Sequence, residues 1–363
     1  ATLAAWESGI SRPTIAQASR LAACFRVPLS TLYLERPPWE FKTAPVDFRR
    51  AANGERLPGS PVLIAEWLRA YARSQLAANL TSEPNAPLFA GGQRETMATD
   101  AEASALTWRE RFAIDLAQQR RLGQSDHAGI DTWSDAVESQ GVCVSFTDDA
   151  GGSIDPGLFR ALTFYDKSYS VITLSAGLAS PVQVFTLLHE FGRLLLGGRG
   201  ISNGWLPATA GDPPGDTEQW CNRFAAAFLM PEAAFRAHPI TVRCAASNDW
   251  SADAIPALAA DFGMGEEAIV RRLLTLGLIS HTLYVEMCMA QAATNPATSQ
   301  LLRTGQSAAG FPSHQNVLRR EGRRFARTML RAHHDGRIGL RELAGCLQSD
   351  VACIQGMEKE LFC

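Results

Sequence analysis

The stretch VFTLLHEFGRLLLGG, residues 184–198, is apolar on nearly every side of the helix that it predicts. Together with the proline before it, the pattern favours a helix over residues 181–196 that ends at the glycine pair. A helix that is apolar nearly all round lies in the centre of its domain. His189, Glu190 and Arg193 interrupt the apolar run, so we do not expect them to be ordinary surface residues.

His189 and Glu190 fill the first two places of H-E-x-x-H, in which two histidines four residues apart bind zinc from one helix face. Such a site needs three protein ligands and a water, and the glutamate takes a proton from that water. Arg193 stands in the place of the second histidine, and a guanidinium offers no lone pair and repels a cation. Glu218, 29 residues after His189, is suited to be the third ligand.

The residues alone leave three interpretations of this helix open. In the first, which is favoured, Arg193 replaces the metal and pairs with Glu190 or Glu218, so that the buried carboxylates stay compensated. In the second, Zn²⁺ binds at low occupancy to a residual or rebuilt site, for which His238 is a further candidate ligand. In the third, the helix is only a core element.

The order of the expected elements predicts an α+β fold that is mostly α. The segment VCVSF at 142–146 predicts a short strand, and the segments 158–166 and 168–175 predict two strands that pair as a hairpin. Helical spacing recurs in most of the remaining chain, as in residues 60–80, 100–123 and 217–230. These elements predict a small β-sheet beside an active-site helix.

Two motifs in this order and at this spacing resemble the ImmA/IrrE family of metallopeptidase-like regulators. The first is the helix quoted above, and the second is TEQWCNRFAAAFLMP at 217–231. The matching positions of the second motif are Glu218, Cys221, Asn222, Phe224, Ala225, Ala226, Leu229, Met230 and Pro231. The resemblance covers most of residues 1–280.

The resemblance implies a zincin-like domain in which His189 is the first metal ligand, Glu190 the general base and Glu218 the third ligand. Because Arg193 departs from the family pattern, we expect a degenerate zinc-peptidase-like domain that is inactive or weak. The implied function is that of a transcriptional regulator or antitoxin-like protein, acting by DNA and protein binding. The alternative is an active zinc metallo-endopeptidase that cleaves a partner repressor.

The N-terminal segment ATLAAWESG resembles the end of the recognition helix of an XRE-type helix-turn-helix, and the first two helices of such a domain are expected to be absent. Residues 1–50 hold seven Lys or Arg against four Asp or Glu, a balance compatible with phosphate contact. Thr2, Trp6 and Arg12 are therefore the candidate DNA-binding residues, and an operator is a candidate partner.

The tail begins with LRREGRRFARTMLRAHH at 318–334, a basic helix with an apolar stripe. It predicts either a helical bundle with a solvated basic face or a surface that docks onto an acidic protein or nucleic acid, such as a toxin nuclease. The expected division is a partial helix-turn-helix (1–36), the zincin-like domain with a helical lead-in (37–280), a linker (281–315) and a basic helical domain (316–363).

Composition limits the remaining function classes. The net charge of -3 argues against a protein that coats nucleic acid along its whole surface. Eight cysteines without a C-x-x-C pair, and the lack of an apolar run of about 18 residues, favour a cytoplasmic protein with no membrane partner. A repressor or toxin nuclease remains the expected partner protein, and a homodimer is among the expected assemblies.

Overall fold

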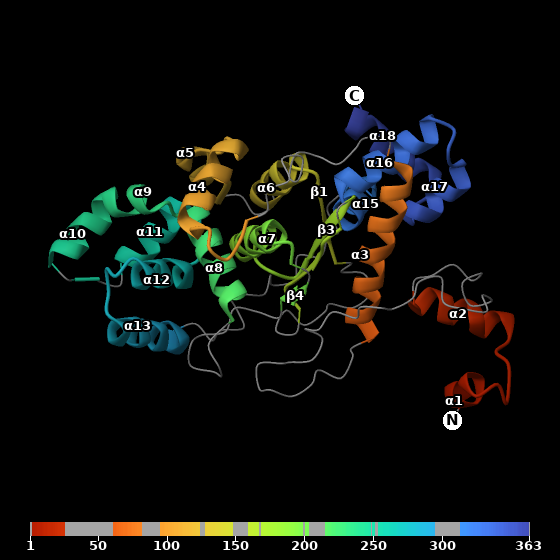
Figure 1. The fold of residues 1–363 in the computed structure, drawn as a ribbon, viewed down its shortest axis with the longest axis horizontal. Helices are drawn as coiled ribbons and strands as arrows, with labels where there is room; N and C mark the ends of the chain where they lie inside the picture. Colours follow the sequence, from red (N-terminus) through yellow and green to blue (C-terminus); the bar gives the residue numbers. More distant parts are fainter. Residues whose placement is uncertain are drawn as a thin grey trace.

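The computed structural model describes residues 2–25, 61–81, 95–123, 128–147, 159–166, 168–198, 200–202, 215–247, 249–250, 253–294 and 313–362. Helices dominate these residues and surround a small sheet, which confirms the expected α+β, mostly α fold (Figure 1).

The helices before the central one are α1 (Thr2–Glu7), α2 (Ile15–Phe25), α3 (Pro61–Leu80), α4 (Ala101–Phe112), α5 (Leu116–Gly123) and α6 (Ala128–Ser139). The central helix is α7 (Ser180–Leu195), followed by α8 (Asp216–Leu229), α9 (Glu232–Ala237), α10 (Pro239–Ser247), α11 (Ala254–Phe262), α12 (Glu266–Thr275) and α13 (His281–Thr294). The C-terminal helices are α15 (Ser313–Glu321), α16 (Arg323–His334), α17 (Leu340–Leu347) and α18 (Val351–Phe362).

The sheet has four strands in the order β1-β3-β2-β4. Its strands are β1 (Val142–Phe146), β2 (Ala161–Phe164), β3 (Ser170–Leu174) and β4 (Gly200–Ser202). The expected hairpin is confirmed, because β2 pairs with β3 in antiparallel fashion. Strand β1 joins the other edge of β3 in parallel, and β4 pairs antiparallel with β2.

Side chains that alternate along the strands divide the interior into two cores, as the period of two in a strand requires. On one face, β1 contributes Val142, Val144 and Phe146 to a core shared with α4, α6, α7, α8, α11 and α12. On the other face, Cys143 and Leu162 join a core built from α3 and the C-terminal helices. The sheet is therefore buried on both faces, and α7 packs directly on β2 and β3.

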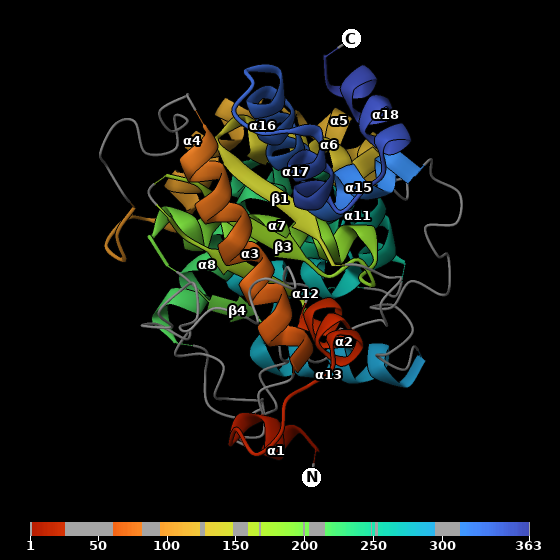
Figure 2. The ribbon, with the colours of Figure 1, turned by 90° about the vertical axis from the view of Figure 1, so that its right-hand side faces the viewer.

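The C-terminal helices complete the second core, whereas the sequence suggested a separate domain over 316–363. Helices α15 and α16 pack on β1, and α16 also packs along α3 (Figures 1 and 2). Gly322, at φ 91°, separates α15 from α16, and a Cβ there would lie 2.6 Å from Sγ of Cys143. The reason for the difference is long-range packing, which the spacing of apolar residues within one helix does not encode.

Two other boundaries differ from the sequence expectation. The predicted helix over 100–123 divides into α4 and α5, because Ala113 adopts a left-handed conformation (φ 54°) and Asp115 accepts the N–H of Gln118 at the start of α5. The expected linker over 281–315 opens with α13, which packs on α12 and buries Tyr284.

Helices α1 and α2 lie apart from the other described elements in Figure 1. They fall within the expected helix-turn-helix remnant, whose residues 26–36 lie outside the described residues. Among the described helices, none combines the length and the apolar character that a membrane crossing requires.

A buried carboxylate connects α6, β1 and α16. Glu138 is 8% exposed, and it accepts the N–H of Val144 at 3.1 Å through Oε1 and the N–H of Arg324 at 3.0 Å through Oε2. Burial raises the pKa of Glu138 to about 7, although both N–H donors act to lower it. This carboxylate therefore links the start of α16 to the edge strand β1.

We predict that Glu138 makes the protein less stable as the pH rises from about 4.5 to about 7. In this window the folded state keeps a proton that the unfolded chain releases, so the unfolding free energy falls by about 3 kcal/mol at most. Urea unfolding from pH 4 to 8 should show a flatter pH dependence in Glu138→Gln, apart from a constant offset. An unchanged slope in the variant would contradict this assignment.

Candidate functional site

The close approach of α7 and α8 creates the site. Gly192 lies where the two helices meet, and a Cβ there would be 3.0 Å from Cδ1 of Phe224. Phe224 in turn stacks on Trp220 with a centroid distance of 5.4 Å, and Phe191 contacts both Trp108 and Phe224. This aromatic core fixes α7 against α8.

The polar side chains of α7 meet Glu218, which lies in the first turn of α8. Nε2 of His189 is 3.2 Å from Oε2 of Glu218, and Nη2 of Arg193 donates to Oε1 of the same carboxylate. Nε of Arg193 also donates to Oε2 of Glu190 at 3.2 Å. The expectation that Arg193 pairs with Glu190 or Glu218 is confirmed for both residues, and we call these four side chains the Arg193 cluster.

Because the cluster is largely buried, the pKa values of its side chains depend on the charges of their neighbours. Glu190 is fully buried and Arg193 is 5% exposed, whereas the Glu218 side chain is 38% exposed and forms the accessible side of the cluster. Burial acts to lower the pKa of Arg193, but Glu190 and Glu218 outweigh it and hold that pKa above its ordinary value. Burial likewise acts to raise the pKa of Glu218, but His189 and Arg193 lower it to about 2. The guanidinium is therefore the permanent counter-charge of both carboxylates.

Two further side chains orient the cluster, and the sequence did not single them out for that role. Oγ1 of Thr163, on β2, donates to Oε2 of Glu190, so this hydrogen bond ties the carboxylate to the sheet. Oδ1 of Asn222 lies 2.9 Å from Nδ1 of His189 and fixes the ring. The position of Asn222 one turn after Glu218 was a usable signal, whereas the contact of Thr163 depends on how β2 packs under α7.

The glycine pair that ends α7 makes room for the arginine. A Cβ on Gly198 would lie 2.9 Å from Cγ of Arg193, so the backbone passes directly over the arginine side chain. Gly197 ends the helix at φ 72°, a conformation that glycine adopts without strain. The turn therefore closes one side of the cluster and keeps the guanidinium between the two carboxylates.

The donor set does not fit a zinc ion. His189 and Glu218 face each other, but Nη2 of Arg193 lies 3.4 Å from Nε2 of His189 and contacts the carboxylate as well. A cation bound by these two residues would meet the guanidinium, which repels it and supplies no lone pair. Within the described ranges, no group of three or more His, Cys, Asp or Glu side chains is arranged to hold a metal ion.

His238, the further candidate ligand, is engaged elsewhere. Its Nε2 lies 3.2 Å from Oδ2 of Asp261, its Nδ1 accepts the N–H of Ile240, and its ring contacts Phe262. It therefore joins α9 and α10 to α11. Among the described residues, His238 does not join a group of three possible metal ligands. The sequence did not reveal its carboxylate partner, because Asp261 lies 23 residues further along the chain.

Several arginines of the basic tail are paired within the fold. Arg319 pairs with Asp131, Arg320 with Glu321 and Arg323 with Glu360, while Arg324 lies over the ring of Tyr169 at 5.5 Å. These arginines join α15 and α16 to neighbouring elements. At the other end of the chain, Thr2 and Trp6 belong to α1, and Arg12 is exposed in the turn before α2.

We predict that Arg193→Ala lowers the unfolding free energy by about 3–5 kcal/mol, because it leaves Glu190 as a buried, uncompensated charge. Adding Glu190→Gln to this variant should recover part of the loss, since the amide carries no charge. Urea unfolding followed by tryptophan fluorescence measures both effects.

The matched control is Arg337→Ala, which removes the partly exposed pair of Arg337 with Asp335. This change should alter the unfolding free energy by less than about 1 kcal/mol, because water screens such pairs. A loss in Arg193→Ala no larger than that of the control would show that the cluster does not depend on its charge balance.

Comparison with known families gives a match over the central part of the chain. Residues 137–274 match the family model described as the IrrE N-terminal-like domain, Peptidase_M78. No match was found among curated proteins. The matched range contains the whole sheet, α7 and α8, and therefore every residue of the Arg193 cluster. Residues 137–274 are thus similar to the zinc-peptidase-like domain of the ImmA/IrrE family.

Proposed function

We propose that this protein is a regulator or antitoxin-like protein whose peptidase-like domain binds a partner protein and does not hydrolyse peptide bonds. The observation that carries this proposal is the Arg193 guanidinium between Glu190 and Glu218. Hydrolysis of the zincin type needs a metal-bound water beside a free carboxylate base. Here Glu190, which stands in the position of the base, is ion-paired with Arg193 and accepts a hydrogen bond from Thr163.

The matching family model supports this proposal at the level of the domain, because residues 137–274 carry both motif helices. A degenerate domain of this kind would keep the packing of α7 on α8 while losing the chemistry. The partner would be a repressor or a toxin nuclease. It would meet the cluster at Glu218, the side chain of the four with the largest exposed fraction.

The alternative function is that of a zinc metallo-endopeptidase that cleaves a partner repressor. The distance of 3.2 Å between Nε2 of His189 and Oε2 of Glu218 favours it, because two ligands of one tetrahedral zinc lie about 3.3 Å apart when each bond is about 2.0–2.1 Å. This pair alone supplies two ligands, so the alternative requires a third donor and the displacement of Arg193.

We predict that the unmodified protein contains well under one equivalent of zinc after purification, and that Arg193→His raises the zinc content. The substitution restores the i, i+4 pair of histidines beside Glu218 and removes the repelling charge. Atomic absorption on dialysed protein measures the metal. Arg193→Gln is the matched control, since it removes the charge without supplying an imidazole, and its zinc content should stay low.

Activity separates the proposed function from its alternative. A co-expressed repressor should remain intact in the presence of the unmodified protein, with or without chelator. Stoichiometric zinc in the unmodified protein, together with cleavage that is lost in Glu190→Gln, would establish the peptidase instead. Equal zinc uptake by Arg193→His and Arg193→Gln would show that position 193 is not a ligand position.

We further propose that the N-terminal segment contributes to DNA binding through Thr2, Trp6 and Arg12. The exposed fraction of Arg12 and the basic balance of residues 1–50 support this proposal. The pairing of Arg319, Arg320 and Arg323 within the fold makes the C-terminal helices a weaker candidate for phosphate contact.

We predict that Arg12→Ala weakens binding to duplex DNA and lowers the slope of log K against log salt by about 1, as expected for one lost phosphate contact. Fluorescence anisotropy at several salt concentrations measures both quantities. Arg337→Ala removes an equal charge at the far end of the chain and serves as the control. The proposal fails if both variants bind with the affinity and salt slope of the unmodified protein.

A further inference from the structure

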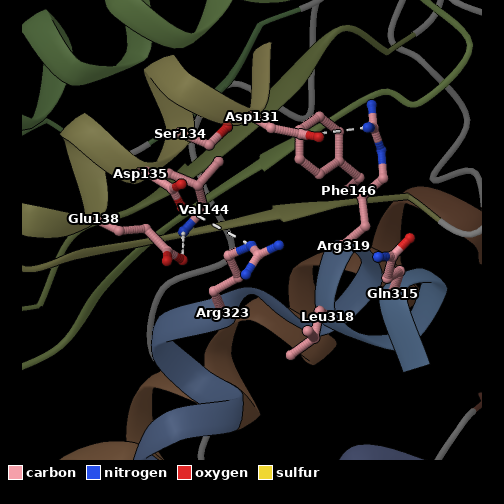
Figure 3. Close-up of a pocket in the computed structure, with 10 residues that line it drawn as sticks. All are labelled: Asp131, Ser134, Asp135, Glu138, Val144, Phe146, Gln315, Leu318, Arg319 and Arg323. Carbon is pink, nitrogen blue, oxygen red and sulfur yellow. Dashed lines mark hydrogen bonds and ion pairs between the residues drawn. The ribbon is translucent and has the colours of Figure 1, made fainter. Parts of the chain in front are cut away.

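A pocket of about 170 Å³ lies at the β1 edge of the sheet, and none of its lining residues belongs to the Arg193 cluster (Figure 3). Helix α6 forms one wall, α15 and the first residue of α16 form the other, and β1 lies at the base. Val144, Phe146 and Leu318 give the pocket an apolar floor. The pocket is therefore shaped for a ligand with a hydrocarbon portion.

The wall formed by α6 is acidic. Asp131, Asp135 and Glu138 are four and three residues apart, so they share one face of the helix and all line the pocket. Asp131 is compensated by Arg319, which lies 3.2 Å away and also covers the Phe146 ring at 4.4 Å. Glu138 uses both oxygens to accept backbone N–H groups.

Asp135 is the carboxylate that remains least compensated. Its contact with Arg323 is long, 3.9 Å from Nε to Oδ1, because Nη2 of Arg323 pairs with Glu360. Its side chain is 61% exposed at the mouth of the pocket. Asp135 is therefore the residue through which this wall carries negative charge, beside an apolar floor.

A hydroxyl in the same wall supplies the second, independent observation. Ser134 lies between Asp131 and Asp135 on α6, lines the pocket and is only 9% exposed. Within the part of the chain that the structure describes, its Oγ has no hydrogen-bond partner. An unmade hydrogen bond at a buried hydroxyl costs about 1–3 kcal/mol, which a bound donor would offset.

We propose that this pocket binds an alkylammonium group, with the ammonium between Asp135 and Ser134 and the alkyl chain along Val144 and Leu318. The geometry favours an ammonium because it is compact and offers three donors, which suits one carboxylate and one hydroxyl acceptor. A free polyamine or a lysine side chain of a partner protein would supply the same chemistry. The site is independent of the function proposed for the Arg193 cluster.

Isothermal titration calorimetry on the full chain tests this site with three probes. Putrescine represents the free polyamine, Nα-acetyl-lysine methylamide represents a lysine side chain, and Nα-acetyl-norleucine methylamide is the neutral control. We expect saturable binding of at least one charged probe, with a dissociation constant of about 1 mM or tighter, and no binding of the neutral one. Binding of only one charged probe identifies the source of the ammonium.

The variants locate the binding. Asp135→Asn should weaken binding about tenfold, as the loss of one charge partner predicts, and Ser134→Ala should weaken it by a smaller factor. Asp253→Asn changes an exposed carboxylate before α11 and should leave the affinity unchanged. Asp135 is largely exposed, so its variant should keep the thermal unfolding midpoint. Equal affinity in Asp135→Asn, binding of the norleucine probe, or no binding of either charged probe would overturn the proposal.

Discussion

The compensation of two buried carboxylates by one guanidinium is the constraint on which the centre of this molecule depends. Glu190 is fully buried in a helix that is otherwise apolar, and Glu218 closes on the same helix from α8. An ionised carboxylate in such surroundings needs a counter-charge. Arg193 supplies it from within α7, where a zinc ion would supply it in a zinc-peptidase-like site.

The use of Arg193 as the counter-charge has consequences for the packing around it. The arginine stem needs space above the end of α7, which Gly198 leaves free. The guanidinium reaches Glu218 only because α7 and α8 approach closely at Gly192, where Phe224 contacts the helix backbone. The charge balance and the aromatic core are therefore two parts of one arrangement. A change in either would alter what the accessible side of the cluster presents to a partner.

Arginine–carboxylate pairs also occur near the edge strand β1. Arg319, Arg320 and Arg323 are held by Asp131, Glu321 and Glu360, and Glu138 accepts a backbone N–H at the start of α16. Part of this basic sequence thus contributes to the scaffold. The least compensated carboxylate at this edge is Asp135, which is why a cationic ligand suits that pocket better than an anionic one.

The sequence by itself determined the helix α7, the hairpin of β2 and β3, and the pairing of Arg193 with Glu190 or Glu218. The first two follow from local periodicity. The pair with Glu190 follows from the i, i+3 geometry of one helix, whereas the pair with Glu218 also needed the close approach of α8. The roles of Thr163 and Gly198, the engagement of His238 with Asp261, and the packing of the C-terminal helices on β1 were decided by the tertiary structure. These contacts join residues far apart in the chain, and their energies depend on which surfaces meet, which no local pattern encodes.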